Sequence, residues 1–281
     1  MILVLDGYSL LFRAFFALPP MTTRAGLPTG ALYGVSVLLL KLLREERPAG
    51  LVIAIDAPSQ TIRRTEYPAY KAGRMAAPDP LRSQIARFPE LAEALGVPLH
   101  QVRGWEADDV IATLTRRVRP TLVVSGDTDL LQLVDPDTTV LFVGRRQKDH
   151  VRYDVTQVEA RYGIPASGIP TWKALAGDPS DNLPGVDGIG GKTASRLVAE
   201  HGDAAAILAA RERIGSSKVR AALDGATELL PQWEALGRLR TDLALEEPLY
   251  APIGSYDGLR AWFEELEFAS LAARLDKLDG R

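Results

Sequence analysis

The sequence predicts an α/β fold in which a mainly parallel central sheet is flanked by helices, followed by a helical part. Two observations support this. In the first half of the chain, short apolar runs alternate with helical patterns, which is typical of parallel sheets covered by helices. After about residue 163 the strand patterns end, and segments rich in Ala, Leu and Arg follow. We therefore expect a sheet part at residues 1–165 and a helical part at residues 166–281.

The apolar runs expected to form strands are short and lie between longer helical patterns. The expected strands are residues 2–5, 51–55, 121–124 and 140–143, and the expected helices are residues 31–43, 81–95 and 110–117. Pro78 and Pro80 predict a loop at residues 74–80. A stretch rich in Gly and Pro, residues 177–191, interrupts the helical part.

Composition excludes several classes of protein. The 281 residues are 46% hydrophobic and 25% charged, as in ordinary folded domains, and a disordered scaffold does not fit. The longest apolar run, residues 35–43, is too short to cross a membrane, and no basic leader precedes the first strand. We expect a cytoplasmic protein without a membrane partner. The chain has no Cys, and its three His lack metal-ligand spacing, so oxygen atoms would have to hold any metal.

Carboxylates follow the predicted strands at the points where these strands end. Asp6 and Asp56 come directly after two strands, at the sheet edge where open α/β folds bind ligands. Taken singly, an Asp after a strand is more often a turn former or a helix cap. Further acids precede the helix at 110–117, follow the third strand, or lie in the glycine-rich stretch, and these are Glu106, Asp108, Asp109, Asp127, Asp129, Asp178 and Asp181.

Such a set of acids exceeds what helix capping needs, although acids in a first helical turn also complement the helix dipole. Carboxylates gathered in one pocket raise one another's pKa, so a cation must offset their repulsion. Oxygen ligands suit Mg²⁺ or Mn²⁺. Two such ions could activate a water and neutralise the leaving oxygen in a displacement at phosphorus. The pattern therefore predicts phosphodiester hydrolysis.

Five motifs together resemble one family. They are Asp6-Gly7 with Arg13-Ala14-Phe15, YPAYKAGR at 67–74, GWEADD at 104–109, DTDLLQL at 127–133 and GDPSDNLPGVDGIG at 177–190. The chain resembles the 5′ nuclease (5′-3′ exonuclease) domain of bacterial DNA polymerase I and the flap endonucleases over nearly its whole length. This resemblance implies a helical arch and a helix-hairpin-helix-like (helix-3-turn-helix) element that binds DNA.

The resemblance also implies a role for each matched residue. It assigns Asp6, Asp56, Glu106 and Asp108 to a first divalent-metal site, and Asp127, Asp129, Asp178 and Asp181 to a second, with Asp109 as a nearby acid of the same metal cluster. It implies that Lys71 and Arg74 on the arch contact the scissile phosphate in catalysis. The remaining DNA-binding positions would be Arg13, Arg63 and Tyr70. From composition alone, Lys71 and Arg74 would instead be expected on a solvated helix face.

The glycine-rich stretch ends in Gly-Lys-Thr but does not form a phosphate-binding P-loop. Val186 stands where the first Gly of that motif belongs, and no strand precedes it. A turn between helices that meets a DNA phosphate fits better, with an ordinary helix connection as the alternative. The resemblance implies that backbone carbonyls of Gly185, Val186 and Ile189 hold K⁺ beside duplex DNA, and that Lys192 contacts the DNA backbone.

The expected function is that of a structure-specific 5′ nuclease in DNA replication and repair. Its expected partner is DNA with 5′ flaps, branches or nicks, recognised by shape, and we expect a monomer with no indicated protein partner. Two alternatives stay open: a non-catalytic DNA-binding relative, and a single-strand ribonuclease on a related acidic α/β core. Whether the chain is free-standing or part of a polymerase is also open. The four Trp are expected to pack in cores.

Overall fold

In the computed structural model, residues 1–73, 76–144, 146 and 149–278 are described. The central sheet has six strands in the order β3-β2-β1-β4-β5-β6, and every neighbouring pair is parallel except β5 and β6. The strands are β1 (Ile2–Asp6), β2 (Gly50–Ala54), β3 (Leu99–His100), β4 (Thr121–Ser125), β5 (Thr138–Phe142) and β6 (Val151–Tyr153). The predicted fold class is thus confirmed. The sequence patterns missed β3 and β6, which are short strands at the two edges.

The three central strands are continuous apolar runs because both of their faces are buried. Successive side chains of a strand point to opposite faces. Val4 and Val52 therefore join one hydrophobic core, whereas Leu3, Leu5 and Leu51 join a second core on the other face.

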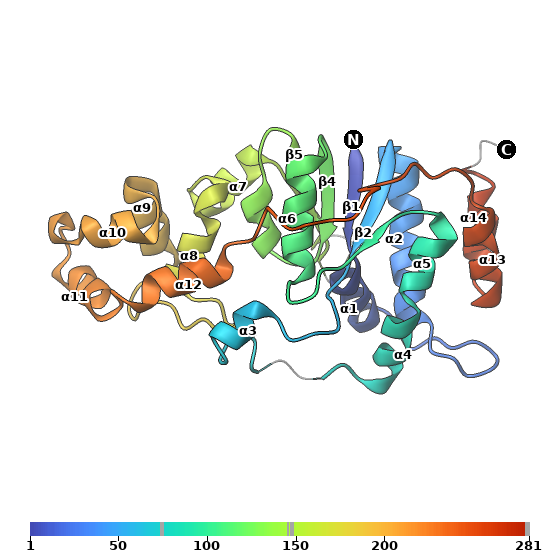
Figure 1. The fold of residues 1–281 in the computed structure, drawn as a ribbon, viewed down its shortest axis with the longest axis horizontal. Helices are drawn as coiled ribbons and strands as arrows, with labels where there is room; N and C mark the ends of the chain where they lie inside the picture. Colours follow the sequence, from blue (N-terminus) through green and yellow to red (C-terminus); the bar gives the residue numbers. More distant parts are fainter. Residues whose placement is uncertain (74–75, 145, 147–148, 279–281) are drawn as a thin grey trace.

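Helices cover both faces of the sheet (Figure 1). The first core joins the sheet to α6 (Ala107–Arg117) and continues into the helical part. The second core is covered by α1 (Gly7–Ala17), α2 (Gly30–Glu46), α4 (Asp79–Arg87) and α5 (Pro89–Leu95). The pattern at 81–95 predicted one helix, but α4 and α5 are separate, with Pro89 at the first position of α5.

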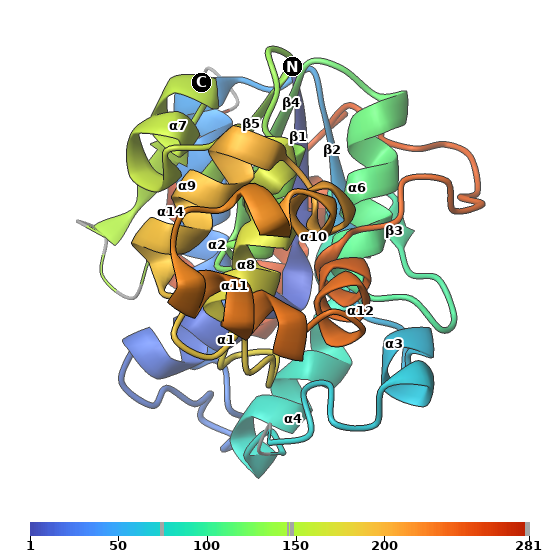
Figure 2. The ribbon, with the colours of Figure 1, turned by 90° about the vertical axis from the view of Figure 1, so that its left-hand side faces the viewer.

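The helical part extends from one end of the sheet (Figures 1 and 2). It contains α7 (Val155–Tyr162), α8 (Ile169–Ala176), α9 (Gly191–His201), α10 (Ala204–Ala209), α11 (Ser217–Gly225) and α12 (Leu229–Gly237). The turn at 177–190 joins α8 to α9, which is the arrangement expected of a helix-hairpin-helix-like element.

After α12 the chain returns to the sheet part. The expected division into residues 1–165 and 166–281 did not include this return. Leu51 and Ala251 exchange two backbone hydrogen bonds. The last helices, α13 (Asp257–Glu265) and α14 (Ala269–Leu275), bring Trp262 and Phe263 into the second core at the opposite end of the molecule (Figure 1). A helical pattern shows which face of a helix is apolar, but it does not show which distant surface that face will cover.

Candidate active site

The predicted acids gather at the carboxyl ends of the central strands. Asp6 ends β1, Asp56 follows β2, and Asp127 follows β4. Asp56 is exposed and Asp127 is half-buried, while the other seven predicted acids are buried. Asp56 and Asp127 therefore lie nearest to the solvent.

Burial and neighbouring carboxylates raise the pKa of two of these acids. The pKa of Asp6 is raised to about 7, mainly by burial and further by Asp56 and Asp127, although a hydrogen bond from Ser125 opposes the rise. Burial also raises the pKa of Asp108 well above its usual value, and Asp127 and Asp6 add to this effect. Such mutual repulsion is expected only where carboxylates share a small volume.

Helix α6 positions two acids through its first turn. Asp56 Oδ1 accepts a hydrogen bond from the Ala107 backbone N–H at 2.8 Å. Asp109 Oδ2 accepts one from the Glu106 backbone N–H at 3.2 Å. Asp109 therefore caps the N-terminus of α6, as an acid in a first helical turn can do.

Arg63 was expected to contact DNA, but its side chain is buried. It is 5% exposed, and its guanidinium pairs with both oxygens of Asp109 at 2.5 and 2.6 Å. It also donates to the backbone carbonyls of Leu236 and Arg238. Arg63 and Asp109 therefore form a buried pair that joins α3 (Ile62–Glu66) to α6 and to the end of α12. This arrangement gives both residues a structural role, because their charged groups already have protein partners.

The segment expected to form the arch follows α3. Its described residues 68–73 form turns, not helix. The Tyr70 hydroxyl donates to Asp181 at 2.9 Å and to Glu106 at 3.1 Å, and burial followed by these two carboxylates raises the pKa of Tyr70. Lys71 Nζ lies 2.7 Å from Glu106 Oε1 and 3.8 Å from Asp181 Oδ1.

A solvated helix face is therefore the wrong description of Lys71, whose side chain is 10% exposed. Its backbone N–H bonds to the Asp181 carbonyl at 3.1 Å, and its φ of +54° belongs to the left-handed region. Arg74 lies outside the described residues.

A second cation was missed by the sequence analysis. Lys173 of α8 is buried and pairs with Asp178 Oδ2 at 2.7 Å and with Asp129 Oδ1. Burial favours a higher pKa for Asp178, but Lys173 lowers it below its usual value. The only local signal was a Lys five residues before an acid, which does not distinguish this pair from an exposed one.

The donor chemistry of the pocket fits a divalent cation. All nine predicted ligands are carboxylates, which suit hard ions such as Mg²⁺ and Mn²⁺. Burial, and after it repulsion from neighbouring carboxylates, raises the pKa of Asp6 and Asp108, and a bound cation would offset both effects. Within the described ranges, however, no three His, Cys, Asp or Glu side chains stand in a metal-ligand arrangement. Lys71 and Lys173 instead contact Glu106, Asp181, Asp129 and Asp178.

Arg13 contacts the chain directly after β4, and Lys192 lies in the helix that follows the glycine-rich turn. Arg13 donates to the Gly126 carbonyl at 2.6 Å, directly before Asp127, and its guanidinium lies over the Phe142 ring. Lys192 is exposed in the first turn of α9. The DNA contacts expected of Arg13 and Lys192 stay predictions.

The glycine-rich turn depends on Gly185. Its φ is +74°, and a Cβ at this position would lie 2.4 Å from the Gly177 backbone nitrogen. The Val186 N–H bonds to the Leu175 carbonyl, and the Val186 carbonyl accepts the Ile189 N–H at 3.0 Å. These bonds fix the backbone of the turn. The K⁺ site on the carbonyls of Gly185, Val186 and Ile189 stays a prediction.

We expect Gly185→Ala to lower the free energy of unfolding by about 2 kcal/mol or more, because both the positive φ and the backbone contact disfavour a side chain. Gly225→Ala at the end of α11 is the matched control, since nothing lies within 4 Å of its added Cβ and its φ is ordinary. The control should be unchanged or slightly more stable. Urea unfolding measures both variants, and equal midpoints would contradict this account of the turn.

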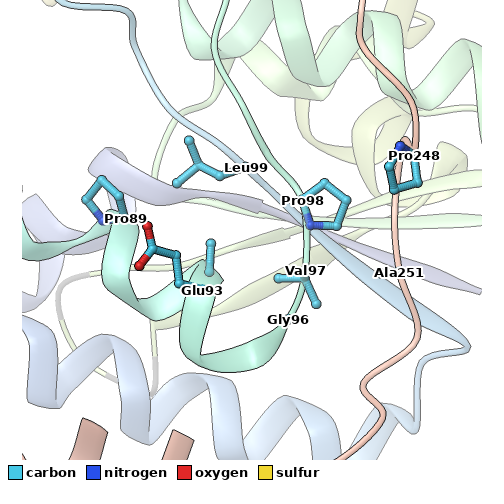
Figure 3. A pocket seen from close by; sticks show the side chains of 9 residues that line it. Pro89, Glu93, Gly96, Val97, Pro98, Leu99, Pro248 and Ala251 are labelled. Atoms are coloured by element: carbon cyan, nitrogen blue, oxygen red, sulfur yellow. The ribbon is translucent and has the colours of Figure 1, made fainter. Parts of the chain in front are cut away.

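An apolar pocket on α5 carries none of this chemistry (Figure 3). It has a volume of about 390 Å³ and is lined by α5, the strand β3 and the returning segment near Pro248 and Ala251. Glu93 is its one charged lining residue, and no predicted site residue reaches it. Among the described helices, none is long and apolar enough to span a membrane.

Two family models match consecutive parts of the chain. Residues 1–163 match "5′-3′ exonuclease, N-terminal resolvase-like domain", and residues 164–253 match "5′-3′ exonuclease, C-terminal SAM fold". The second match ends before α13.

Curated relatives and solved structures give the same picture. DNA polymerase I of Mycobacterium bovis is 38% identical over 98% of this chain and 31% of its own length, so the chain spans about a third of that relative. A protein named 5′-3′ exonuclease from Aquifex aeolicus is also 38% identical, over 98% of this chain and 95% of its own length. The structure of T5 5′-exonuclease with bound zinc is 21% identical, with a TM-score of 0.67 over 99% of this chain and 97% of that one. That likeness shows a shared fold.

Proposed function

Because the chain belongs to the 5′-3′ exonuclease family, we propose that it is a divalent-metal-dependent 5′ nuclease that hydrolyses phosphodiester bonds in flapped, branched or 5′-ended DNA. One observation carries the proposal: the acids at three strand ends lie close enough to repel one another, and Asp127 among them also acts on Asp181, which contacts Tyr70 and Lys71. This chain covers 95% of the Aquifex aeolicus relative, and the name of that relative, 5′-3′ exonuclease, supports the activity.

The metal ligands fall into two groups in this proposal. Asp6, Asp56, Glu106 and Asp108 would hold one divalent cation, and Asp127, Asp129, Asp178 and Asp181 the other. When bound, Mg²⁺ or Mn²⁺ would supply activation of the attacking water and neutralisation of the leaving oxygen. The metal-bound structures among the fold neighbours support divalent ions in general, and the choice of Mg²⁺ or Mn²⁺ is part of the proposal.

The chain's own cations would act on the phosphate. Lys71 lies beside Glu106 and Asp181, so its ammonium group is already within the pocket. Its charge would stabilise the negative charge that develops on the phosphate oxygens during cleavage. Arg74 is proposed to act beside it. Tyr70 would keep Asp181 and Glu106 in place through its two hydrogen bonds.

The protein would bind duplex DNA through the phosphates of the DNA backbone, at a distance from the metal-binding acids. Lys192 and the glycine-rich turn, with K⁺ on the backbone carbonyls of Gly185, Val186 and Ile189, would contact DNA phosphates without reading sequence. Arg13 would contact the strand near the cleavage point. Recognition would therefore depend on the shape of the junction.

The proposal is tested by cleavage of a labelled 5′-flap duplex with Mg²⁺, beside a single-stranded RNA of equal length and a reaction with EDTA. We expect cuts near the branch, none in EDTA, and no cleavage of the RNA, because the helical part offers contacts to a duplex. Binding of the flap without cleavage in Mg²⁺ or Mn²⁺ would point to a non-catalytic relative. Preferential cleavage of the RNA would favour a ribonuclease.

A further inference from the structure

A groove lies between α3 and α12 and is lined in part by Arg63, which pairs with Glu106 and Asp109. Its volume is about 410 Å³, and its lining includes Ile62, Tyr67, Trp105, Leu236, Arg238 and Arg240. Both ribbon views place α3 next to α12 (Figures 1 and 2). We name it the α3–α12 groove.

Trp105 does not pack as the sequence analysis expected. Trp233 and Trp262 are buried, but Trp105 is half-exposed and belongs to neither core in the described part of the chain. The Arg240 guanidinium lies over its ring, 5.4 Å from the centroid. Asp242 holds that guanidinium through two hydrogen bonds of 2.9 and 2.7 Å. An aromatic ring and a planar cation are thus held together at the surface.

The groove is connected to the acidic pocket through short links in the chain. Trp105 directly precedes Glu106, and Tyr67 lies three residues before Tyr70. Arg63 lines the groove and also pairs with Asp109 and Glu106. We take the nucleotide next to the phosphate at the acids to be the one that enters the groove.

We propose that the α3–α12 groove binds one nucleobase of the substrate's single-stranded segment by stacking it on the Trp105–Arg240 pair. This inference rests on the proposed nuclease function. Aromatic rings and guanidinium planes are the usual stacking partners of unpaired bases, and every base has a π-face, so the contact is tolerant of sequence. Arg238 and Arg240 are exposed at the rim, where each guanidinium is paired with a carboxylate, Glu234 and Asp242 respectively.

The test compares flap cleavage by Trp105→Ala and wild type with Mg²⁺ over a range of enzyme concentrations, which separates half-saturation from maximal rate. We expect Trp105→Ala to raise the half-saturating concentration roughly 5- to 100-fold on a natural flap, as for loss of one stacked base. On a flap whose single-stranded residues are abasic, the variant and wild type should be equal. Trp105→Phe should restore most of the affinity because a stacking ring remains.

Two further variants keep the test specific. Arg103→Ala removes a nearby exposed cation outside the groove and should leave both parameters unchanged. Arg240→Lys keeps the charge but loses the planar group, so it should raise half-saturation on the natural flap only. Equal half-saturation for wild type and Trp105→Ala on the natural flap would overturn the inference, as would a loss confined to maximal rate. Absence of cleavage by wild type would instead refute the proposed function.

Discussion

Replacing Asp127 by Asn is expected to lower the rate of flap cleavage by about a thousandfold, on the scale seen when one stabilising group is removed from a charged active site. Asp127 raises the pKa of Asp6, Asp108 and Asp181, so its charge acts on acids of both proposed metal groups. The substitution removes that charge. Asn can still accept the hydrogen bond that Asp127 Oδ1 receives from the Asp129 N–H, so the loop keeps its local structure.

Single-turnover cleavage of the labelled flap with saturating Mg²⁺ measures this loss. Glu93→Gln is the matched control, because it removes one exposed carboxylate from the pocket of Figure 3 without touching the acids. The control should cleave at the wild-type rate, and both variants should show the wild-type circular dichroism spectrum. Wild-type cleavage by Asp127→Asn would exclude Asp127 from the metal cluster.

In the absence of divalent cations at pH 8, Asp6→Asn is expected to be more stable than wild type by up to about 4 kcal/mol. Asp6 has a pKa of about 7 in the folded protein, against 3.8 for an unperturbed group. The folded state therefore binds one more proton than the unfolded state between these values. Wild-type stability should accordingly fall as the pH rises from about 4 to about 7. Asn stays neutral and can still accept the Ser125 hydroxyl bond.

Urea unfolding at pH 5 and pH 8, with EDTA or with Mg²⁺, measures the effect. The difference between variant and wild type should be about 1.6 kcal/mol at pH 5, because Asp6 of the unfolded chain is already ionised there, and should reach about 4 kcal/mol above pH 7. Burial also raises the pKa of Asp108 and Asp181, so these acids contribute to the pH dependence of wild-type stability as well. The difference in stability between Asp6→Asn and wild type isolates the contribution of Asp6. Mg²⁺ should stabilise wild type more than the variant. A constant difference between pH 5 and pH 8 in EDTA would refute the account.

The sequence by itself determined the four longer strands of the sheet, the acids at their carboxyl ends and the glycine-rich turn. Strands buried on both faces must be continuous apolar runs, and parallel strands bring their carboxyl ends to one edge, so Asp6 and Asp127 were predictable from position alone. Gly185 was predictable because a tight turn needs a residue that tolerates positive φ. The family resemblance then assigned roles, including that of Lys71.

Only the tertiary structure decided which groups these residues meet. It paired Lys173 with Asp129 and buried Arg63 against Asp109. It also left Trp105 at the surface beneath Arg240 and carried α13 back to the second core. The physical reason is that charge and aromatic character are local properties of a residue, whereas burial and pairing depend on contacts between residues far apart in the chain. Local periodicity specifies an element and its apolar face, but not the partner that this face will cover.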